Sequence, residues 1–150
     1  MKIADLLSPR DVALDVRAGD KTRLLRQLST QAAAALGLTE DEIAAGLLRR
    51  EALGSTGVGD GVALPHARLS GLKTPFGLLV RLRQAIDFQA IDGQPVDLVF
   101  LLLLPAAPHE GLNALACVAR ALRDPETLRR VRSAADREAL FQAIADSGSQ

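Results

Sequence analysis

The pattern of apolar and polar residues along the chain predicts a succession of strands and amphipathic helices. Runs that are rich in Val, Leu and Phe, or that alternate with a two-residue period, predict strands at 12–16, 62–64, 76–82 and 96–104. Apolar residues at three- and four-residue spacing predict helices at 21–36, 40–52, 110–122, 125–131 and 136–145. Residues 1–11 then form a short lead-in, and residues 147–150 a frayed tail.

Residues that suit helix ends support these boundaries. Asp20 can cap the helix over 21–36, and Gly37 can end it. Thr39 and the acidic residues after it form a capping-box pattern for the next helix. Asp124, which is followed by proline, suits the start of the helix over 125–131.

The run over 96–104 predicts the centre of the sheet. Its nearly continuous Val, Leu and Phe indicate burial on both faces, as in a sheet that is covered by helices. A short piece at 85–88 and a turn at 92–95 join it to the strand over 76–82, which predicts an antiparallel hairpin. We therefore expect an α/β fold, a mixed β-sheet flanked by helices on both faces, in a single domain that spans 1–150.

Composition excludes several classes of function. The 150 residues are 48% hydrophobic and 24% charged, which is typical of a globular domain, and the net charge is zero. No overall field favours nucleic acid, and the absence of Trp and Tyr removes the usual platforms for stacking bases. The longest apolar run, at 98–104, is far too short to cross a bilayer, and Asp5 and Pro9 interrupt any signal sequence. The single cysteine, Cys117, excludes an internal disulfide and fits the cytoplasm.

The stretch at 54–68 concentrates the features that point to a site. Four of its fifteen residues are glycine, so its backbone can approach a partner closely. The strand at 62–64 follows, and Pro65 is expected to end it. His66 should then emerge just past a strand end, where a rigid sheet can present one side chain.

The chain has two histidines, and both follow a proline at the end of a predicted strand. Strand ends in open α/β sheets are common ligand sites, so we expect His66 and His109 to face one crevice. His109 also precedes a predicted helix, whose N-terminal amides favour an anion.

Two imidazoles beside an anion-binding cradle suit phosphoryl transfer through a phosphohistidine. An imidazole of ordinary pKa, about 6.5, is a good nucleophile near neutral pH. Catalysis of this step is mostly positioning and charge stabilisation. The loop amides of Gly54, Ser55, Thr56 and Gly57 are candidates for this role, as are the guanidinium groups of Arg50 and Arg68.

Other interpretations of these residues are open from the pattern alone. Arg50 at a helix end can simply complement the dipole, Arg68 can be a solvated charge, and Ser55 and Thr56 can be turn formers. A structural role is the more usual one for a histidine.

Rival chemistries are less well supported. His66, His109 and either Glu110 or Asp60 would be a poor ligand set for zinc, so no metal is expected. A hydrolase triad of Ser55, His66 and Asp60 lacks the Gly-x-Ser-x-Gly elbow, and the glycine loop is not a Walker A sequence.

A set of short motifs lies between residues 50 and 119. It comprises Arg50-Glu51, Gly-Ser-Thr-Gly-Val-Gly at 54–59, Val-Ala-Leu-Pro-His-Ala-Arg at 62–68, Ile-Asp-Phe at 86–88, Ala-Ile-Asp-Gly at 90–93, Pro-Val-Asp-Leu-Val-Phe at 95–100, and His109 with Leu112, Leu115 and Ala119. Together these motifs resemble the enzyme IIA domains of the mannitol/fructose class of the bacterial phosphotransferase system. The resemblance implies the mixed sheet flanked by helices that the pattern predicts independently.

The resemblance also implies a role for three residues. His66 matches the family's phosphorylated histidine, His109 its second active-site histidine, and Arg50 an arginine of the same site. The donor would be a small histidine-containing phosphocarrier protein, which enzyme I charges from phosphoenolpyruvate. Neither a metal nor another cofactor is implied.

Within this family, the chain most resembles the nitrogen-related branch, because it has the Gly-Ser-Thr-Gly motif and these residues contain no transport domain. The resemblance then implies a regulator whose phosphorylation state controls targets such as a potassium transporter or a sensor kinase. One alternative is a sugar-specific IIA component that passes phosphate to a IIB domain for fructose or mannitol uptake. Another is a binding module that keeps the fold and carries no phosphate.

Overall fold

The computed structural model describes residues 1–107 and 111–147. Two short 3₁₀ turns, η1 and η2, come first, and strands and helices follow in the order of the sequence. The elements are η1 Ile3–Asp5, η2 Pro9–Asp11, β1 Val12–Val16, α1 Lys21–Leu36, α2 Glu40–Ala52, β2 Gly57–Gly59, β3 Val62–Ala63, β4 His66–Leu69, β5 Phe76–Ile86, β6 Val96–Pro105, α3 Leu112–Arg123, α4 Pro125–Ser133 and α5 Arg137–Asp146.

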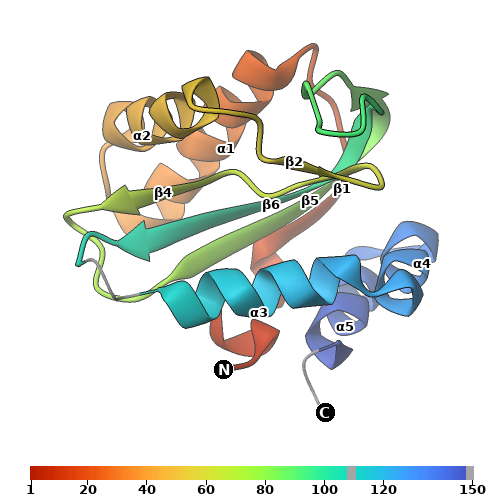
Figure 1. Cartoon of the computed structure of the whole chain (residues 1–150). Coiled ribbons are helices and arrows are strands. Elements are labelled where there is room, and N and C mark those ends of the chain that lie inside the picture. Colours follow the sequence, from red (N-terminus) through yellow and green to blue (C-terminus); the bar gives the residue numbers. More distant parts are fainter. Residues whose placement is uncertain (108–110, 148–150) are drawn as a thin grey trace.

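The strands form one mixed sheet with β6 near its centre (Figure 1). The order is β1-β5-β6-β3-β2, and β4 also pairs with β6, beyond β3. The pair β5–β6 is antiparallel, which confirms the predicted hairpin, and β3 and β4 both run parallel to β6. The expected mixed α/β sheet is confirmed.

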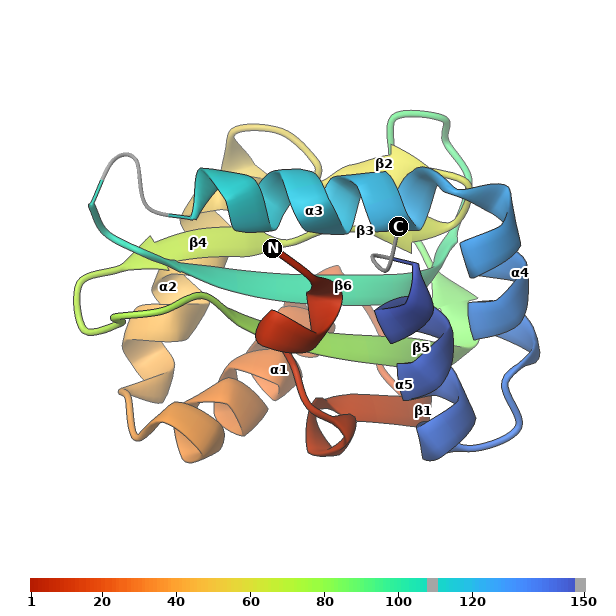
Figure 2. The same cartoon turned by 90° about the horizontal axis from the view of Figure 1, so that it is seen from below.

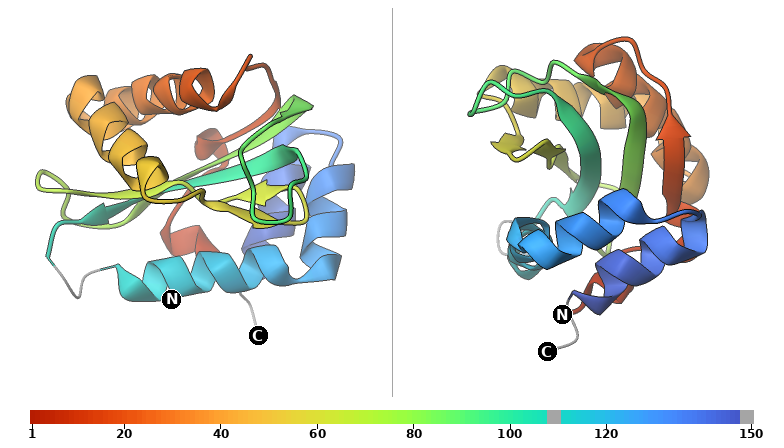
Figure 3. Two further views of the ribbon diagram at one scale, coloured as in Figure 1. Left: turned by 45° about the horizontal axis from the view of Figure 1, so that its top comes forward. Right: turned by 90° about the vertical axis from the view of Figure 1, so that its right-hand side faces the viewer.

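Helices cover both faces of this sheet. In Figure 1, α1 and α2 lie on one side of the strands and α3, α4 and α5 on the other. Figure 2 shows the second face, where the N-terminal turns join α3 and α5 over the sheet. In the right-hand view of Figure 3, which looks along the strands, the sheet runs between the two helical layers.

Side chains of β6 pack alternately into the two hydrophobic cores. Leu98, Phe100 and Leu102 pack with the N-terminal turns and α3 to α5, whereas Val99 and Leu101 pack with α1 and α2. All five side chains are fully buried. The continuous apolar run therefore reflects burial on both faces, as predicted.

The helix-end signals hold in part. The Asp20 carboxylate accepts the Arg23 amide at 2.8 Å, and α1 ends at Gly37 in the left-handed conformation with φ 68°. The capping-box prediction at Thr39 is wrong, because its side chain makes no capping hydrogen bond. The first turn of α2 instead places three acidic residues at the positive end of the helix dipole.

Several predicted boundaries move. The strand predicted over 76–82 continues to Ile86 and includes the first half of the piece predicted at 85–88, with a register shift between Arg81 and Ile86. The glycine stretch contains a strand, β2, which the sequence pattern does not predict. The predicted start of α3 at 110 and most of the predicted tail lie outside the described residues. Among residues 1–107 and 111–147, no helix is long and apolar enough to span a bilayer.

Candidate functional site

His66 begins β4 on a strand line that runs beside β6. Ala63 in β3 pairs with Val99, and His66 pairs with Leu102, so the register along β6 is the same before and after Pro65. The Pro65 carbonyl accepts the Leu102 amide at 2.9 Å. The prediction that His66 lies just past a strand end is therefore wrong, because Pro65 interrupts the strand without shifting it.

The His66 ring is held by the backbone that precedes it. Its Nδ1 lies 2.9 Å from the Leu64 carbonyl oxygen. A carbonyl can only accept, so this contact assigns the proton to Nδ1 of the neutral ring and leaves the lone pair on Nε2. The side chain is half-buried. By strand alternation it leaves β4 on the side opposite Ala67 and Leu69, which pack with the helices α1 and α2.

A pocket of about 620 Å³ adjoins the ring. It is bounded by the end of α2 and the start of β4, and its lining is Gly46, Arg49, Arg50, Ala52, Leu53, His66, Ala67 and Arg68. Three arginine residues thus line the same pocket as His66. This arrangement can bind an anion, and it can place that anion beside a nucleophilic nitrogen.

Arg50 lies in the last turn of α2 and contacts the predicted glycine loop. Its Nη1 donates to the Gly54 carbonyl oxygen at 2.8 Å. The structure therefore brings Arg50 and Gly54 together at the edge of the pocket.

Arg68 has structural partners as well as a place in the pocket. Its Nη1 donates to the carbonyl oxygens of Pro105 and Ala107, each at 3.0 Å. These bonds fasten β4 to the segment that follows β6. His109, the second predicted site histidine, lies outside the described residues.

Ser55 and Gly57 shape the loop that precedes β2. The Ser55 hydroxyl donates to the Phe88 carbonyl at 2.6 Å and accepts the Gly57 amide at 3.0 Å. A Cβ on Gly57 would lie 2.8 Å from the Cβ of Ala90, closer than side chains pack, so only glycine fits there. The loop therefore lies tightly against residues 88–90.

Glu51 is a site-supporting residue to which the sequence analysis gave no role. It lies in the last turn of α2, where its side chain is only 5% exposed. Both carboxylate oxygens accept the Thr56 amide at 3.2 Å, and one also accepts the Thr56 hydroxyl. Lys21, the first residue of α1, places its Nζ 2.6 Å from the same carboxylate.

A sequence signal for this pair existed. Acidic residues are unfavourable near the C-terminus of a helix, and basic residues near the N-terminus. Glu51 and Lys21 each occupy the wrong end of a predicted helix, and their mutual neutralisation explains both. Neither position alone identifies the other as its partner.

The described residues do not form the rival hydrolase triad. The Asp60 carbonyl accepts Arg132, and the Asp60 amide donates to Asp92, so Asp60 belongs to the turn between β2 and β3. Because Ser55 bonds to Phe88, the Ser55, His66 and Asp60 side chains make no hydrogen-bonded triad.

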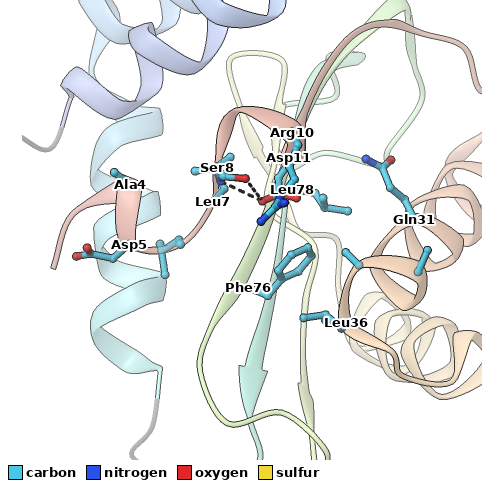
Figure 4. Close-up of a pocket in the computed structure, with 13 residues that line it drawn as sticks. Ala4, Asp5, Leu7, Ser8, Arg10, Asp11, Gln31, Leu36, Phe76 and Leu78 are labelled. Atoms are coloured by element: carbon cyan, nitrogen blue, oxygen red, sulfur yellow. Dashed lines mark hydrogen bonds between the residues drawn. The ribbon is translucent and has the colours of Figure 1, made fainter.

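A second cavity, of about 760 Å³, lies elsewhere (Figure 4). The N-terminal turns, the end of α1 and the beginning of β5 line it, and it shares no lining residue with the pocket beside His66. Ser8 and Asp11 hydrogen-bond to each other at its wall. The candidate chemistry therefore lies at the smaller pocket.

The fold and the sequence together define the class of protein. Over residues 5–147 the chain matches the family described as "Phosphoenolpyruvate-dependent sugar phosphotransferase system, EIIA 2". The chain belongs to this family of phosphotransferase components.

Within the family, the chain is similar to nitrogen regulatory proteins. It is 43% identical over 146 residues to the nitrogen regulatory protein of Bradyrhizobium diazoefficiens, covering 97% of this chain and 95% of that protein. The crystal structure of the nitrogen regulatory protein IIA-Ntr from Neisseria meningitidis superposes with a TM-score of 0.88 at 31% identity, covering 95% of this chain and 98% of that one.

A more distant relative shares the fold. Mannitol enzyme IIA of Escherichia coli, in a complex with phosphorylated enzyme IIB, superposes with a TM-score of 0.77 at 18% identity, covering 93% of this chain and 97% of that chain.

Proposed function

We propose that this chain is a phosphohistidine relay protein that accepts a phosphoryl group on His66 from a histidine-containing phosphocarrier protein. The observation that supports it most directly is the contact of His66 Nδ1 with the Leu64 carbonyl, in a protein of the enzyme IIA family. With its proton on Nδ1, the ring offers Nε2 as the nucleophile.

In the proposed step, a bond forms between Nε2 and phosphorus as the bond between phosphorus and the donor histidine breaks. The His66 ring gains positive charge when its lone pair is used. The Leu64 carbonyl, 2.9 Å from Nδ1, stabilises that charge through the Nδ1–H bond. The donor ring recovers its own lone pair, so no other reactant is required.

Arg50 is proposed to stabilise the phosphoryl oxygens. One nitrogen of its guanidinium is bonded to Gly54, and the fork geometry lets the remaining donors face the pocket. Arg68 borders the same pocket and is a second candidate. The loop over 54–57 supports Arg50 through Gly54.

His109 is proposed as the second active-site histidine. The described residues on either side of it support this role. Ala107 accepts Arg68 through its carbonyl, and a Cβ on Gly111 would lie 2.6 Å from Leu104, the register partner of Arg68. Ala107 therefore contacts Arg68 of β4, and Gly111 lies against the residue of β6 that pairs with Arg68.

The likeness to nitrogen regulatory proteins supports a regulatory role in the cytoplasm for a single enzyme IIA domain over 1–150. In this proposal the phosphorylation state of His66 changes the affinity for a target, such as a potassium transporter or a sensor kinase. Phosphorylation would exchange a half-buried imidazole for a dianion in a pocket bordered by three arginines.

Intact-mass spectrometry tests the relay. After incubation with enzyme I, the phosphocarrier protein and phosphoenolpyruvate, we expect the mass to rise by one acid-labile phosphoryl group. His66→Ala should abolish this gain, and His109→Ala should slow it. Labelling that persists at another residue in His66→Ala would overturn the assignment of His66. Failure of the wild-type chain to gain mass would favour a binding module of the same fold.

A sugar-transport role is the second candidate. The likeness to mannitol enzyme IIA in a complex with phosphorylated IIB favours it. Adding a fructose or mannitol IIB domain to the labelled chain decides between the two. Rapid loss of label to the IIB cysteine supports sugar transport, and retention of the label supports the regulatory role.

A further inference from the structure

A buried network of polar groups lies behind the pocket and joins four separate segments. It contains the Lys21–Glu51 ion pair and Thr56, together with Phe88 in the loop after β5. Lys21 Nζ lies 3.3 Å from the Phe88 carbonyl and 4.8 Å from the centroid of its ring. The Ser55 hydroxyl donates to that same carbonyl. The network therefore joins the start of α1, the end of α2, the residue before β2 and the loop after β5.

Burial of the Lys21–Glu51 ion pair is energetically unfavourable for two reasons. Each charge opposes the dipole of its own helix, and the two side chains are only 15% and 5% exposed. Taking two charges out of water is unfavourable, and apolar residues of similar size in their place are often at least as stable. A stabilising role is therefore a weak explanation for it.

Two chains of contacts lead from Glu51 to the site. In the first, Glu51 accepts Thr56, the Thr56 carbonyl accepts the Leu64 amide at 2.9 Å, and the Leu64 carbonyl contacts His66 Nδ1. The second starts at the same carboxylate. By holding Thr56, Glu51 fixes the loop that carries Gly54, the carbonyl partner of Arg50.

We propose that Glu51, held in place by Lys21, is a positioning residue that orients both the His66 ring and the Arg50 guanidinium for phosphoryl transfer. This inference rests on the proposed function of His66. Glu51 touches neither reacting atom. It acts by keeping Thr56 where Leu64 can fix the ring and where Gly54 can fix the guanidinium.

The test compares Glu51→Ala with the wild-type chain in the transfer reaction from the phosphorylated carrier protein. We expect kcat to fall about 10- to 100-fold, because misplacement of about 1 Å costs this much. The docking surface is intact, so KM should change by less than about threefold. Imidazole ¹⁵N shifts should show that His66 no longer keeps its proton on Nδ1 alone.

Two further variants keep the result interpretable. Lys21→Met/Glu51→Met removes both charges together, so no unpaired ammonium opposes folding, and it should show the same loss of kcat. Leu140→Ala, in the core beneath the other face of the sheet, lowers stability without contacting the network. It should leave kcat and the ¹⁵N shifts unchanged.

The outcomes separate the inference from the function on which it rests. If the wild-type chain is not phosphorylated, the proposed function fails, and the ¹⁵N shifts alone decide whether Glu51 orients the ring. If it is phosphorylated, wild-type kcat in a folded Glu51 variant overturns the inference. A loss no greater than in Leu140→Ala, or unchanged ¹⁵N shifts of His66, overturns it as well.

Discussion

At the scale of single residues, the site depends on side chains that serve two partners. His66 uses Nδ1 for a backbone carbonyl, and Arg50 uses Nη1 for another. The rest of each side chain is proposed to meet the phosphoryl group. His66 would use Nε2 to attack phosphorus, and Arg50 would use its other guanidinium donors to bind the oxygens. The bond to the backbone removes rotational freedom before the partner arrives, which lowers the entropic cost of the reactive arrangement.

Arg50→Lys tests this double use. The substitution keeps the positive charge, but one ammonium cannot reproduce the fork that binds Gly54 and is proposed to hold the phosphoryl oxygens as well. We expect the rate of phosphoryl transfer to His66 to fall about 10- to 100-fold, with little change in the melting temperature. Rapid-quench measurements with the phosphorylated carrier protein give the rate. A rate equal to that of wild type would show that charge alone is sufficient.

At the scale of elements, β6 supplies most of the central packing. Leu101 is fully buried in the core that faces α1 and α2. Truncating it removes the transfer free energy of the side chain and leaves a cavity.

Leu101→Ala should lower the free energy of unfolding by about 2–5 kcal/mol. Urea denaturation monitored by circular dichroism gives this value. Leu53→Ala is the control, because Leu53 is 85% exposed and its truncation should change stability by less than about 0.5 kcal/mol. An unchanged midpoint in Leu101→Ala would show that β6 is peripheral to the core.

Elements with a strong apolar period were predictable from the sequence, and those set by tertiary contacts were not. The helix α1 matches its predicted bounds, because both its apolar face and its end signals are local. The strand β2 has three residues, two of them glycine, and exists because it pairs with β3. No local pattern encodes such a strand.

The candidate site shows the same division. His66 and Arg50 were identified from motif and chemistry, and the structure places both beside one pocket. The effect of Pro65 was mispredicted, because the proline removes one ladder N–H but its carbonyl still accepts the Leu102 amide, so pairing with β6 continues in the same register. Glu51 was missed as a support, since its partners Lys21 and Thr56 come together only when α1 and α2 pack.

At the scale of the whole molecule, one sheet separates two apolar cores and joins them. Neighbouring residues of β6 point into opposite cores. Unfolding of either helical layer would therefore expose one apolar face of β6 to water. We therefore expect the two layers to unfold together.

Tryptophan reporters test this coupling, because the chain has no tryptophan of its own. Phe76→Trp reports on the core beside α1 and α2, and Phe141→Trp on the core beside α3 to α5. The urea midpoints from the two fluorescence signals should coincide with each other and with the midpoint from circular dichroism. Separate midpoints would show that one layer unfolds before the other.

The unbroken register along β3 and β4 has a consequence for changes in chain length. Ala63 and Ala67 both pack with α1 and α2, and His66 leaves the strand on the other side. One residue inserted or deleted between Ala63 and His66 would exchange the two faces for the residues that follow it. The imidazole would then point into the core beside α1 and α2. The connection over 70–75 carries no such constraint, so length variation compatible with the relay belongs there.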